Sequence, residues 1–178
     1  MRTEGHNPVN NKISLVKEVA WASQNMPRTL RQVAALPDLS GVRLACCMHL
    51  DMKMIPLVQG ILDKGAQVFL TTCNPTTVQD DVVAWLVERG AEACAWRNMS
   101  DADWQLDRAA IVARDSLIHL APSELAGAVA ALAGALRPGG QLAVSLESGR
   151  GVRHIDAWWG RPVDLDIVRH DPDAVRAA

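Results

Sequence analysis

Hydrophobic residues along the chain fall alternately into short continuous runs and into runs with helical spacing. Continuous runs predict strands that are buried on both faces, and i, i+3, i+4 spacing predicts helices. The expected strands are Leu44–Cys47, Gln67–Leu70, Ala91–Trp96, Ala109–Ala113, Gln141–Leu146 and an edge strand at Leu165–His170. The expected helices are Ile13–Met26, Pro56–Lys64, Val78–Arg89 and Pro122–Leu136. Strands that alternate with helices favour a single three-layer α/β domain with a mostly parallel sheet.

The two ends of the chain differ from this regular pattern. Residues 1–12 are polar and are expected to form a flexible tail, so that residues 13–178 make up one domain. A chain of 178 residues is long enough to bury a substantial core. Residues 147–162 are rich in Gly and Arg and predict a loop. Trp158 and Trp159 lie inside it, and we expect this pair either to cover a ligand or to contact another subunit.

Composition narrows the class of partner. The chain has 18 basic and 20 acidic residues, with a formal net charge of −2, and this balance does not favour binding to nucleic acid or to an anionic membrane. No apolar run approaches the roughly 20 residues that a membrane span needs, and the polar first residues do not resemble a secretion signal. The four cysteines lie in or beside predicted strands, as reduced buried thiols do. We therefore expect a cytoplasmic protein.

Polar side chains follow the first two predicted strands at the point where each strand ends. His49, Asp51 and Lys53 come after Leu44–Cys47, and an Asn-Pro-Thr-Thr segment comes after Gln67–Leu70. Ligands of open parallel sheets bind outside the carboxyl ends of the strands. The sequence therefore predicts two site loops that lie side by side.

The same stretch carries motifs of a known family. Over residues 13–104 the chain resembles the substrate-binding domain of S-adenosylhomocysteine hydrolase, which typically reads C-L-H-M-T-x-Q-T, then L-G-A-E-V, then C-N-x-x-S-T-Q-D. The matching positions are Cys47-Met48-His49, Gly65-Ala66-Gln67-Val68, and Cys73, Asn74, Gln79 and Asp80, with weaker matches at Glu18–Trp21, Asn25–Pro27, Ala95-Trp96 and Ser100–Trp104. The resemblance implies an adenosyl- or nucleoside-type ligand.

Several positions depart from the family pattern. Asp51, Lys53 and Met54 stand where the family has nucleoside-contacting Thr, Gln and Thr, and a lysine ammonium offers hydrogen-bond donors only. No G-x-G-x-x-G follows residue 104. The family oxidises a ribose hydroxyl with bound NAD, and we do not expect this chain to hold NAD. The expected chemistry is therefore non-redox.

The second half carries another resemblance. Residues 131–145 contain a helix end, then Leu136-Arg137-Pro138-Gly139-Gly140, then an apolar strand, which resembles class I S-adenosylmethionine-dependent methyltransferases. Asp115–Leu120 resembles the segment that precedes that helix. The glycine-rich cofactor loop of those enzymes is missing, but S-adenosylmethionine remains a possible cofactor. Together the two resemblances imply a Rossmann-like domain.

Each residue of the first loop has a functional and a structural interpretation. His49 matches a substrate-contacting histidine of the family and can transfer a proton near neutral pH, or it is an ordinary hydrogen-bonded loop histidine. Asp51 orients His49 or caps the following helix. Lys53 binds a ligand carboxylate or is a solvated surface charge.

The second loop has the same two interpretations. Asn74, Thr76 and Thr77 bind polar ligand groups, or they form a turn with a helix cap. Gln79 and Asp80 match the family as substrate-binding positions, but an acidic residue in the first turn of a helix also suits the helix dipole.

Other polar residues follow the later strands. Glu147 comes after the fifth strand and is a candidate general base, or it lies in an exposed loop. Asp115, His119 and His154 are weaker candidates. No C-x-x-C, H-x-H or H-E-x-x-H occurs, so no metal site is expected.

Three hypotheses follow. The first is a hydrolase-family relative that acts on an adenosyl-type metabolite, with His49, Asp51 and Glu147 as catalytic residues. The second is a methyltransferase-like enzyme that positions a methyl group in line with its acceptor. The third is a non-catalytic binding protein that forms a homo-oligomer through its Trp-containing loop and edge strands.

Overall fold

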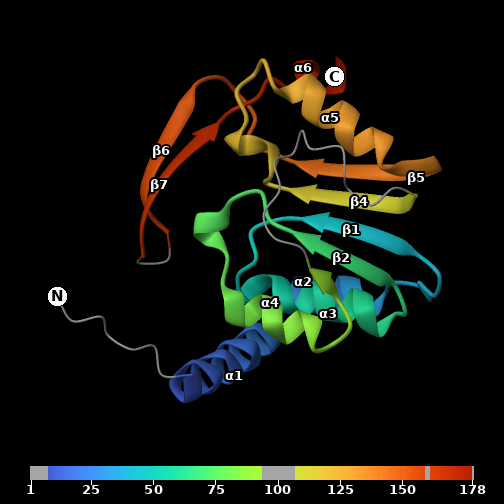
Figure 1. Cartoon of the computed structure of the whole chain (residues 1–178), viewed down its shortest axis with the longest axis vertical. Coiled ribbons are helices and arrows are strands. Elements are labelled where there is room, and N and C mark those ends of the chain that lie inside the picture. The colour runs from blue at the N-terminus through green and yellow to red at the C-terminus, as the bar shows by residue number, and fades with distance from the viewer. Residues whose placement is uncertain (1–7, 94–106, 159–160, 178) are drawn as a thin grey trace.

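The computed structural model describes residues 8–93, 107–158 and 161–177. Its main sheet has five parallel strands in the order β3-β2-β1-β4-β5 (Figure 1). The first strand lies at the centre of the sheet. The chain adds β2 and β3 on one side of β1 and then β4 and β5 on the other, so the order of the strands reverses between β1 and β4, as in doubly wound nucleotide-binding folds. The strands are β1 (Arg43–Cys47), β2 (Gln67–Thr71), β3 (Glu92–Ala93), β4 (Arg108–Arg114) and β5 (Leu136–Ser145).

Helices cover both faces of this sheet. Figure 1 shows one group of helices below the strands and further helices above them. The lower group is α1 (Pro8–Asn25), α2 (Pro27–Ala34), α3 (Ile55–Asp63) and α4 (Asp80–Val87), and α5 (Leu125–Gly134) lies above. Short 3-10 turns η1 (Met52–Met54), η2 (Pro75–Thr77) and η3 (Leu117–His119) follow β1, β2 and β4, and α6 (Pro172–Ala177) ends the chain.

The side chains of each strand alternate between the two faces of the sheet, and the hydrophobic core is therefore divided into two layers. Cys46 and Leu70 pack with the residues of α3 and α4, whereas Cys47 and Phe69 pack with those of α5. Successive side chains of a strand point to opposite faces, so a strand that is apolar throughout needs cover on both sides. The three-layer α/β domain with a parallel sheet is thus confirmed.

The N-terminal helix begins earlier than the sequence pattern predicts. The apolar spacing starts at Ile13, but α1 starts at Pro8, because proline is well tolerated in the first turn of a helix and polar residues can extend it. Residues 8–12 of the expected tail are therefore helical. The third strand is seen at Glu92–Ala93 and begins one residue after the expected start at Ala91, and residues 94–96 of the expected strand lie outside the described residues.

The largest correction concerns residues 147–162, which were expected to form a loop. The structure has an antiparallel pair instead, β6 (Val152–Trp158) with β7 (Arg161–Val168). Residues 165–168 of the expected edge strand Leu165–His170 belong to this pair and not to the main sheet, and His170 forms an isolated bridge with Ser148. Most side chains of β6 are exposed, so the strand carries no continuous apolar run by which it could be recognised. The hairpin stands beyond the carboxyl ends of the main strands (Figure 1).

Within the part of the chain that the structure describes, no helix is both long and apolar enough to cross a membrane.

Candidate functional site

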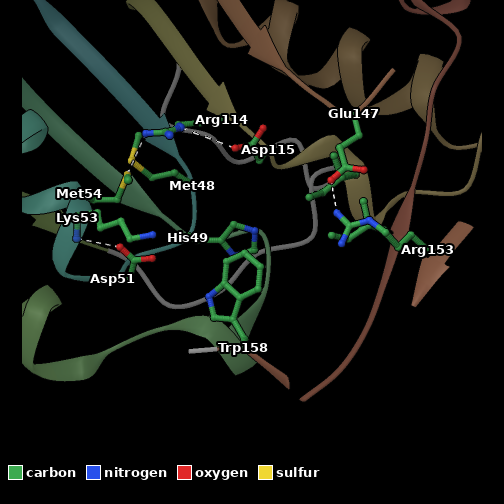
Figure 2. A pocket seen from close by; sticks show the side chains of 12 residues that line it. Met48, His49, Asp51, Lys53, Met54, Arg114, Asp115, Glu147, Arg153 and Trp158 are labelled. Atoms are coloured by element: carbon green, nitrogen blue, oxygen red, sulfur yellow. Dashed lines mark hydrogen bonds and ion pairs between the residues drawn. The ribbon is translucent and has the colours of Figure 1, made fainter. Parts of the chain in front are cut away.

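A cavity of about 260 Å³ lies where β1 and β4 end, between the sheet and the β6–β7 hairpin. Sheets with this strand order bind ligands at the point where the order reverses, which here is between β1 and β4. Side chains from the ends of both strands and from the hairpin line the cavity (Figure 2). They are Met48, His49, Asp51, Lys53, Met54, Arg114, Asp115, Ile118, Glu147, Arg153, Trp158 and Ile167.

The β1–α3 segment supplies one wall. Asp51 is buried, and its Oδ1 accepts a hydrogen bond from the Lys53 backbone N–H at 2.9 Å, which caps η1. Asp51 is thus a cap, as one interpretation predicts, but of the turn η1 and not of the helix α3 that follows it. The same carboxylate also lines the cavity. Figure 2 shows the Lys53 side chain beside it.

The end of β4 supplies a second wall. Asp115 has a φ of 49°, a left-handed conformation that Asp tolerates better than most residues. Ser145 holds it there, because the Ser145 hydroxyl donates to Asp115 Oδ1 at 2.8 Å. Arg114 lies 3.7 Å from Asp115 Oδ2 and 3.7 Å from the Met54 sulfur. This wall therefore presents a fixed pair of opposite charges.

Glu147 closes the cavity toward the hairpin. It forms an ion pair with Arg153 of β6, and a second arginine, Arg169, lies 3.7 Å from its other oxygen. The Glu147 carboxylate therefore links the end of β5 to the hairpin. This pairing is a structural role, whereas a catalytic role for Glu147 stays a prediction.

His49 lies between the sheet and the hairpin. Its ring is 5.5 Å from the Trp158 ring and 5.4 Å from the His119 ring, measured between centroids. Its Nδ1 lies 2.6 Å from the hydroxyl oxygen of Thr77, and that hydroxyl donates to the Asn74 carbonyl at 3.0 Å. This arrangement favours a Thr77 hydroxyl that accepts from His49, which corresponds to the Nδ1–H tautomer of the histidine.

The other predicted residues of the second loop do not line the cavity. Asn74 caps η2, since its Oδ1 accepts from the Thr76 N–H at 2.9 Å and from the Thr76 hydroxyl at 2.7 Å. Gln79 precedes α4 with a buried Oε1, and Asp80 is exposed in the first turn of that helix. Ligand binding by these four residues stays a prediction, and the structure gives each of them a local role.

A compact group of nitrogen and sulfur donors begins at the cavity wall with His49. His49, Cys73 and His119 each offer one donor atom, and these atoms lie within 4.8 Å of one another. A hydrogen bond with Cys47 lowers the pKa of Cys73 to about 5; burial opposes this, and the two histidines add to it. Burial acts to lower the pKa of His119, but the adjacent Cys73 outweighs it and the pKa is raised.

Sequence reasoning missed part of this arrangement. Arg114 and Arg153 line the cavity without belonging to a recognisable motif. The donors of His49, Cys73 and His119 come from three separate segments, so no local spacing reveals them. Trp158 was singled out in an expected loop, and the structure places it at the end of β6, with its ring tilted against His49. Trp159 lies outside the described residues.

Comparison with known proteins gives a consistent result. The family model of S-adenosyl-L-homocysteine hydrolase matches residues 11–120. An adenosylhomocysteinase of Aeropyrum pernix is 33% identical over 101 residues, which are 55% of this chain and 24% of that protein. An S-inosyl-L-homocysteine hydrolase of Methanococcus maripaludis is 32% identical over 90 residues, 49% of this chain and 22% of that protein.

Two solved structures with the same fold are methyltransferases. An S-adenosylmethionine-dependent methyltransferase from Clostridium acetobutylicum superposes with a TM-score of 0.54 at 9% identity, covering 90% of this chain and 77% of that one. An O-methyltransferase family protein from Burkholderia thailandensis gives a TM-score of 0.51 at 16% identity, covering 75% and 41%. At these identities the likeness shows the Rossmann-like fold alone.

The match to the curated relatives is confined to one part of them. The chain spans about a quarter of the length of the relatives named above. The matched residues 11–120 include β1, β2, β4 and the loops that follow them. The resemblance first seen in the motifs around His49 and Cys73 is thereby confirmed. The chain belongs to the S-adenosyl-L-homocysteine hydrolase family.

Proposed function

We propose that the protein binds an adenosyl- or nucleoside-type metabolite in the cavity at the ends of β1 and β4 and acts on it by acid–base chemistry. The observation that carries this proposal is the cavity itself. It lies at the reversal point of the sheet, and its residues His49, Asp51 and Lys53 belong to the segment matched to the family. The names of the two relatives refer to adenosyl- and inosyl-homocysteine.

The size and lining of the cavity suit such a ligand. Its volume of about 260 Å³ lies just below the roughly 300–1,000 Å³ typical of small-molecule sites, so a nucleoside or part of a larger conjugate fits. Trp158 provides an aromatic face, and Met48 and Ile118 provide apolar walls. A purine ring would stack on the tryptophan.

The charges of the cavity are mixed. Lys53, Arg114 and Arg153 are balanced by three carboxylates, those of Asp51, Asp115 and Glu147. An amino-acid group carries one charge of each sign and matches such a lining. In the proposed complex the Lys53 ammonium binds the carboxylate of the ligand, and the fixed Asp115 accepts from its ammonium group.

His49 is the proposed proton carrier. Its Nδ1–H is used by Thr77, so its Nε2 holds a lone pair that can accept a proton. Thr77 therefore acts as a positioning residue that sets the tautomer of His49.

The β1–α3 segment does not fit NAD bound in the usual way. A dinucleotide pyrophosphate approaches the backbone closely through glycines that follow the first strand. Here Met48, His49 and Leu50 follow β1, and Met48 and Leu50 are buried. The proposed reaction therefore involves no step on NAD.

Isothermal titration calorimetry of the full chain tests the proposal. The ligands are S-adenosylhomocysteine, S-adenosylmethionine, adenosine and NAD, each titrated into wild type, Lys53→Ala and His49→Ala. Lys17→Ala is the matched control, because Lys17 is exposed on α1. We expect micromolar binding of an adenosyl compound that is weakened at least tenfold by Lys53→Ala and is unchanged in the control. If none of the four compounds binds, the proposal fails and a non-catalytic role becomes the better hypothesis.

A further inference from the structure

Three side chains, one of which lines the cavity, form a group with the composition of a metal site. His49 follows β1, Cys73 follows β2, and His119 ends η3 after β4. Parallel strands bring their carboxyl ends to one edge of the sheet, so these distant residues converge there. One nitrogen of each histidine and the sulfur of Cys73 lie within 4.8 Å of one another, and all three residues are half-buried.

These separations are close to those that a metal requires. Zinc binds imidazole nitrogen at about 2.0–2.1 Å and thiolate sulfur at about 2.3 Å. Tetrahedral geometry then puts neighbouring donor atoms about 3.3–3.6 Å apart. Donors that already lie within 4.8 Å reach this spacing by small side-chain rotations.

The hydrogen bonds of the two histidines also support a metal site. His49 donates its Nδ1–H to Thr77, whose own hydroxyl proton goes to Asn74. His119 Nδ1 lies 3.2 Å from the Asp166 carbonyl oxygen, which can only accept. With these acceptors beside Nδ1, each neutral ring carries its proton on Nδ1 and has its lone pair on Nε2. Metal-ligating histidines are held in this manner, with the second nitrogen donating to a protein oxygen.

The third observation is a buried nitrogen. His119 Nε2 is buried and has no oxygen or nitrogen partner among the described residues. The Cys73 side chain is its hydrogen-bonding neighbour, and a neutral thiol is a weak partner that offsets only part of the desolvation cost of the nitrogen. A cation bonded to Nε2, with the Cys73 sulfur beside it, would remove that cost.

From these contacts we propose that His49, Cys73 and His119 bind one borderline-soft divalent cation, for which Zn²⁺ is the best match. Two imidazole nitrogens and one thiolate suit zinc better than the hard cations Mg²⁺ or Ca²⁺, which prefer oxygen ligands. Three protein ligands leave a fourth position for water or a ligand atom. The site revises the expectation, drawn from local spacing, that the chain holds no metal.

The metal site and the proposed function share His49, and they are tested separately. A cation on Nε2 would occupy the lone pair that direct proton transfer uses, and a metal-bound water would then be the proton carrier. Metal binding is therefore measured without any adenosyl compound. The calorimetry described above is run on both chelator-treated and metal-loaded protein, so the failure of one proposal leaves the other intact.

Cobalt titration of the reduced full chain is the principal test. Co²⁺ in a tetrahedral site with a thiolate gives a sulfur-to-cobalt charge-transfer band and intense visible bands, and Zn²⁺ abolishes both. We expect one Co²⁺ per chain for wild type. Cys73→Ser should lose the charge-transfer band, and His119→Gln should weaken binding. Cys46→Ala and His154→Gln are the matched controls, because Cys46 lies on the other face of β1 and His154 lies in the hairpin.

A second variant separates a built site from an incidental one. Thr77→Val removes the acceptor of the His49 Nδ1–H without touching a ligand, and Thr77→Ser keeps it. We expect Thr77→Val to lower Zn²⁺ affinity by a factor of about 10 to 100, and Thr77→Ser to restore it. Circular dichroism and thermal unfolding of each variant confirm that it folds. The proposal is overturned if wild type gives no cobalt band, or if Cys73→Ser keeps the wild-type spectrum and affinity.

Discussion

The central strands β1 and β2 of the sheet and the β6 strand of the hairpin differ in how far their residues are buried. All but the first residue of β1 and of β2 are buried, because helices cover both faces of the sheet. In β6 no residue is buried, whereas Leu165 and Ile167 of the neighbouring β7 are 4% exposed. The sheet thus carries the stability of the domain, and the hairpin has one inner side that packs against η3. The cavity lies between these two regions, so one wall is rigid and the other is held by few contacts.

The largest effect expected from this comparison is loss of stability in the sheet. Leu70 of β2 is fully buried between neighbouring strands and the α3–α4 layer. Leu70→Ala should lower the free energy of unfolding by about 2–5 kcal/mol, through lost burial and a residual cavity. Urea denaturation measures the change. Val152→Ala in the exposed part of β6 is the control and should change the free energy of unfolding only slightly. Equal losses of unfolding free energy in the two variants would contradict the view that the sheet, and not the hairpin, carries the stability.

The next effect is on ligand affinity without loss of stability. Trp158→Ala removes the aromatic wall that the hairpin provides. We expect the affinity for the adenosyl compound to fall about tenfold, equivalent to about 1.4 kcal/mol, while the melting temperature changes little. Calorimetry and thermal unfolding give the two values. Trp21→Ala is the control, since Trp21 is half exposed on α1. A large drop in melting temperature would show that the hairpin belongs to the stabilising core.

A smaller effect is expected on the attachment of the hairpin. Glu147→Gln weakens the ion pairs with Arg153 and Arg169. These side chains are partly exposed, so water screens them and global stability should change by less than about 1 kcal/mol. Backbone amides of β6 should nevertheless exchange faster with solvent, because local opening needs only these contacts to break. Hydrogen exchange by mass spectrometry compares the variant with Glu88→Gln, and unchanged β6 exchange would rule out this role.

The smallest expected effect is a dependence of stability on pH that comes from the His154–Asp166 pair. Asp166 accepts from His154 Nδ1 at 3.0 Å across the hairpin, and it raises the pKa of His154, with Asp164 and Asp156 adding to the effect. The folded pKa is above the unfolded value, so the contribution of this pair is fully present below about pH 6.5. It is lost as pH rises through the folded pKa. An NMR titration of His154 should show a raised pKa in wild type and a more ordinary one in Asp166→Asn.

The same contrast explains what the sequence could predict. Strands such as Gln67–Thr71 are apolar because both faces are covered, and this made the sheet and the loops after β1 and β2 recognisable. The family motifs then identified His49. In the hairpin, burial is confined to one side of β7, so the local signal was too weak and residues 147–162 resembled a loop.

Parts of the candidate site were beyond sequence reasoning for a different reason. The predictions for Asp51 and Lys53 placed both residues at the cavity, because a strand end fixes where the next residues lie. The meeting of His119 with Cys73, and of Arg153 with Glu147, depends on how separate segments pack. Such contacts follow from tertiary structure, and no local spacing encodes them.

His49, Cys73 and His119 come from the ends of three different strands, and this affects the kinetics of folding and unfolding. Contacts between parallel strands join residues far apart in the sequence, and such contacts tend to slow folding. The three donors can meet only when β1, β2 and β4 are paired in register. A ligand that binds them would stabilise the native state more than the transition state for folding. Its main effect would therefore be to slow unfolding, and it would give the protein a longer lifetime without making it fold faster.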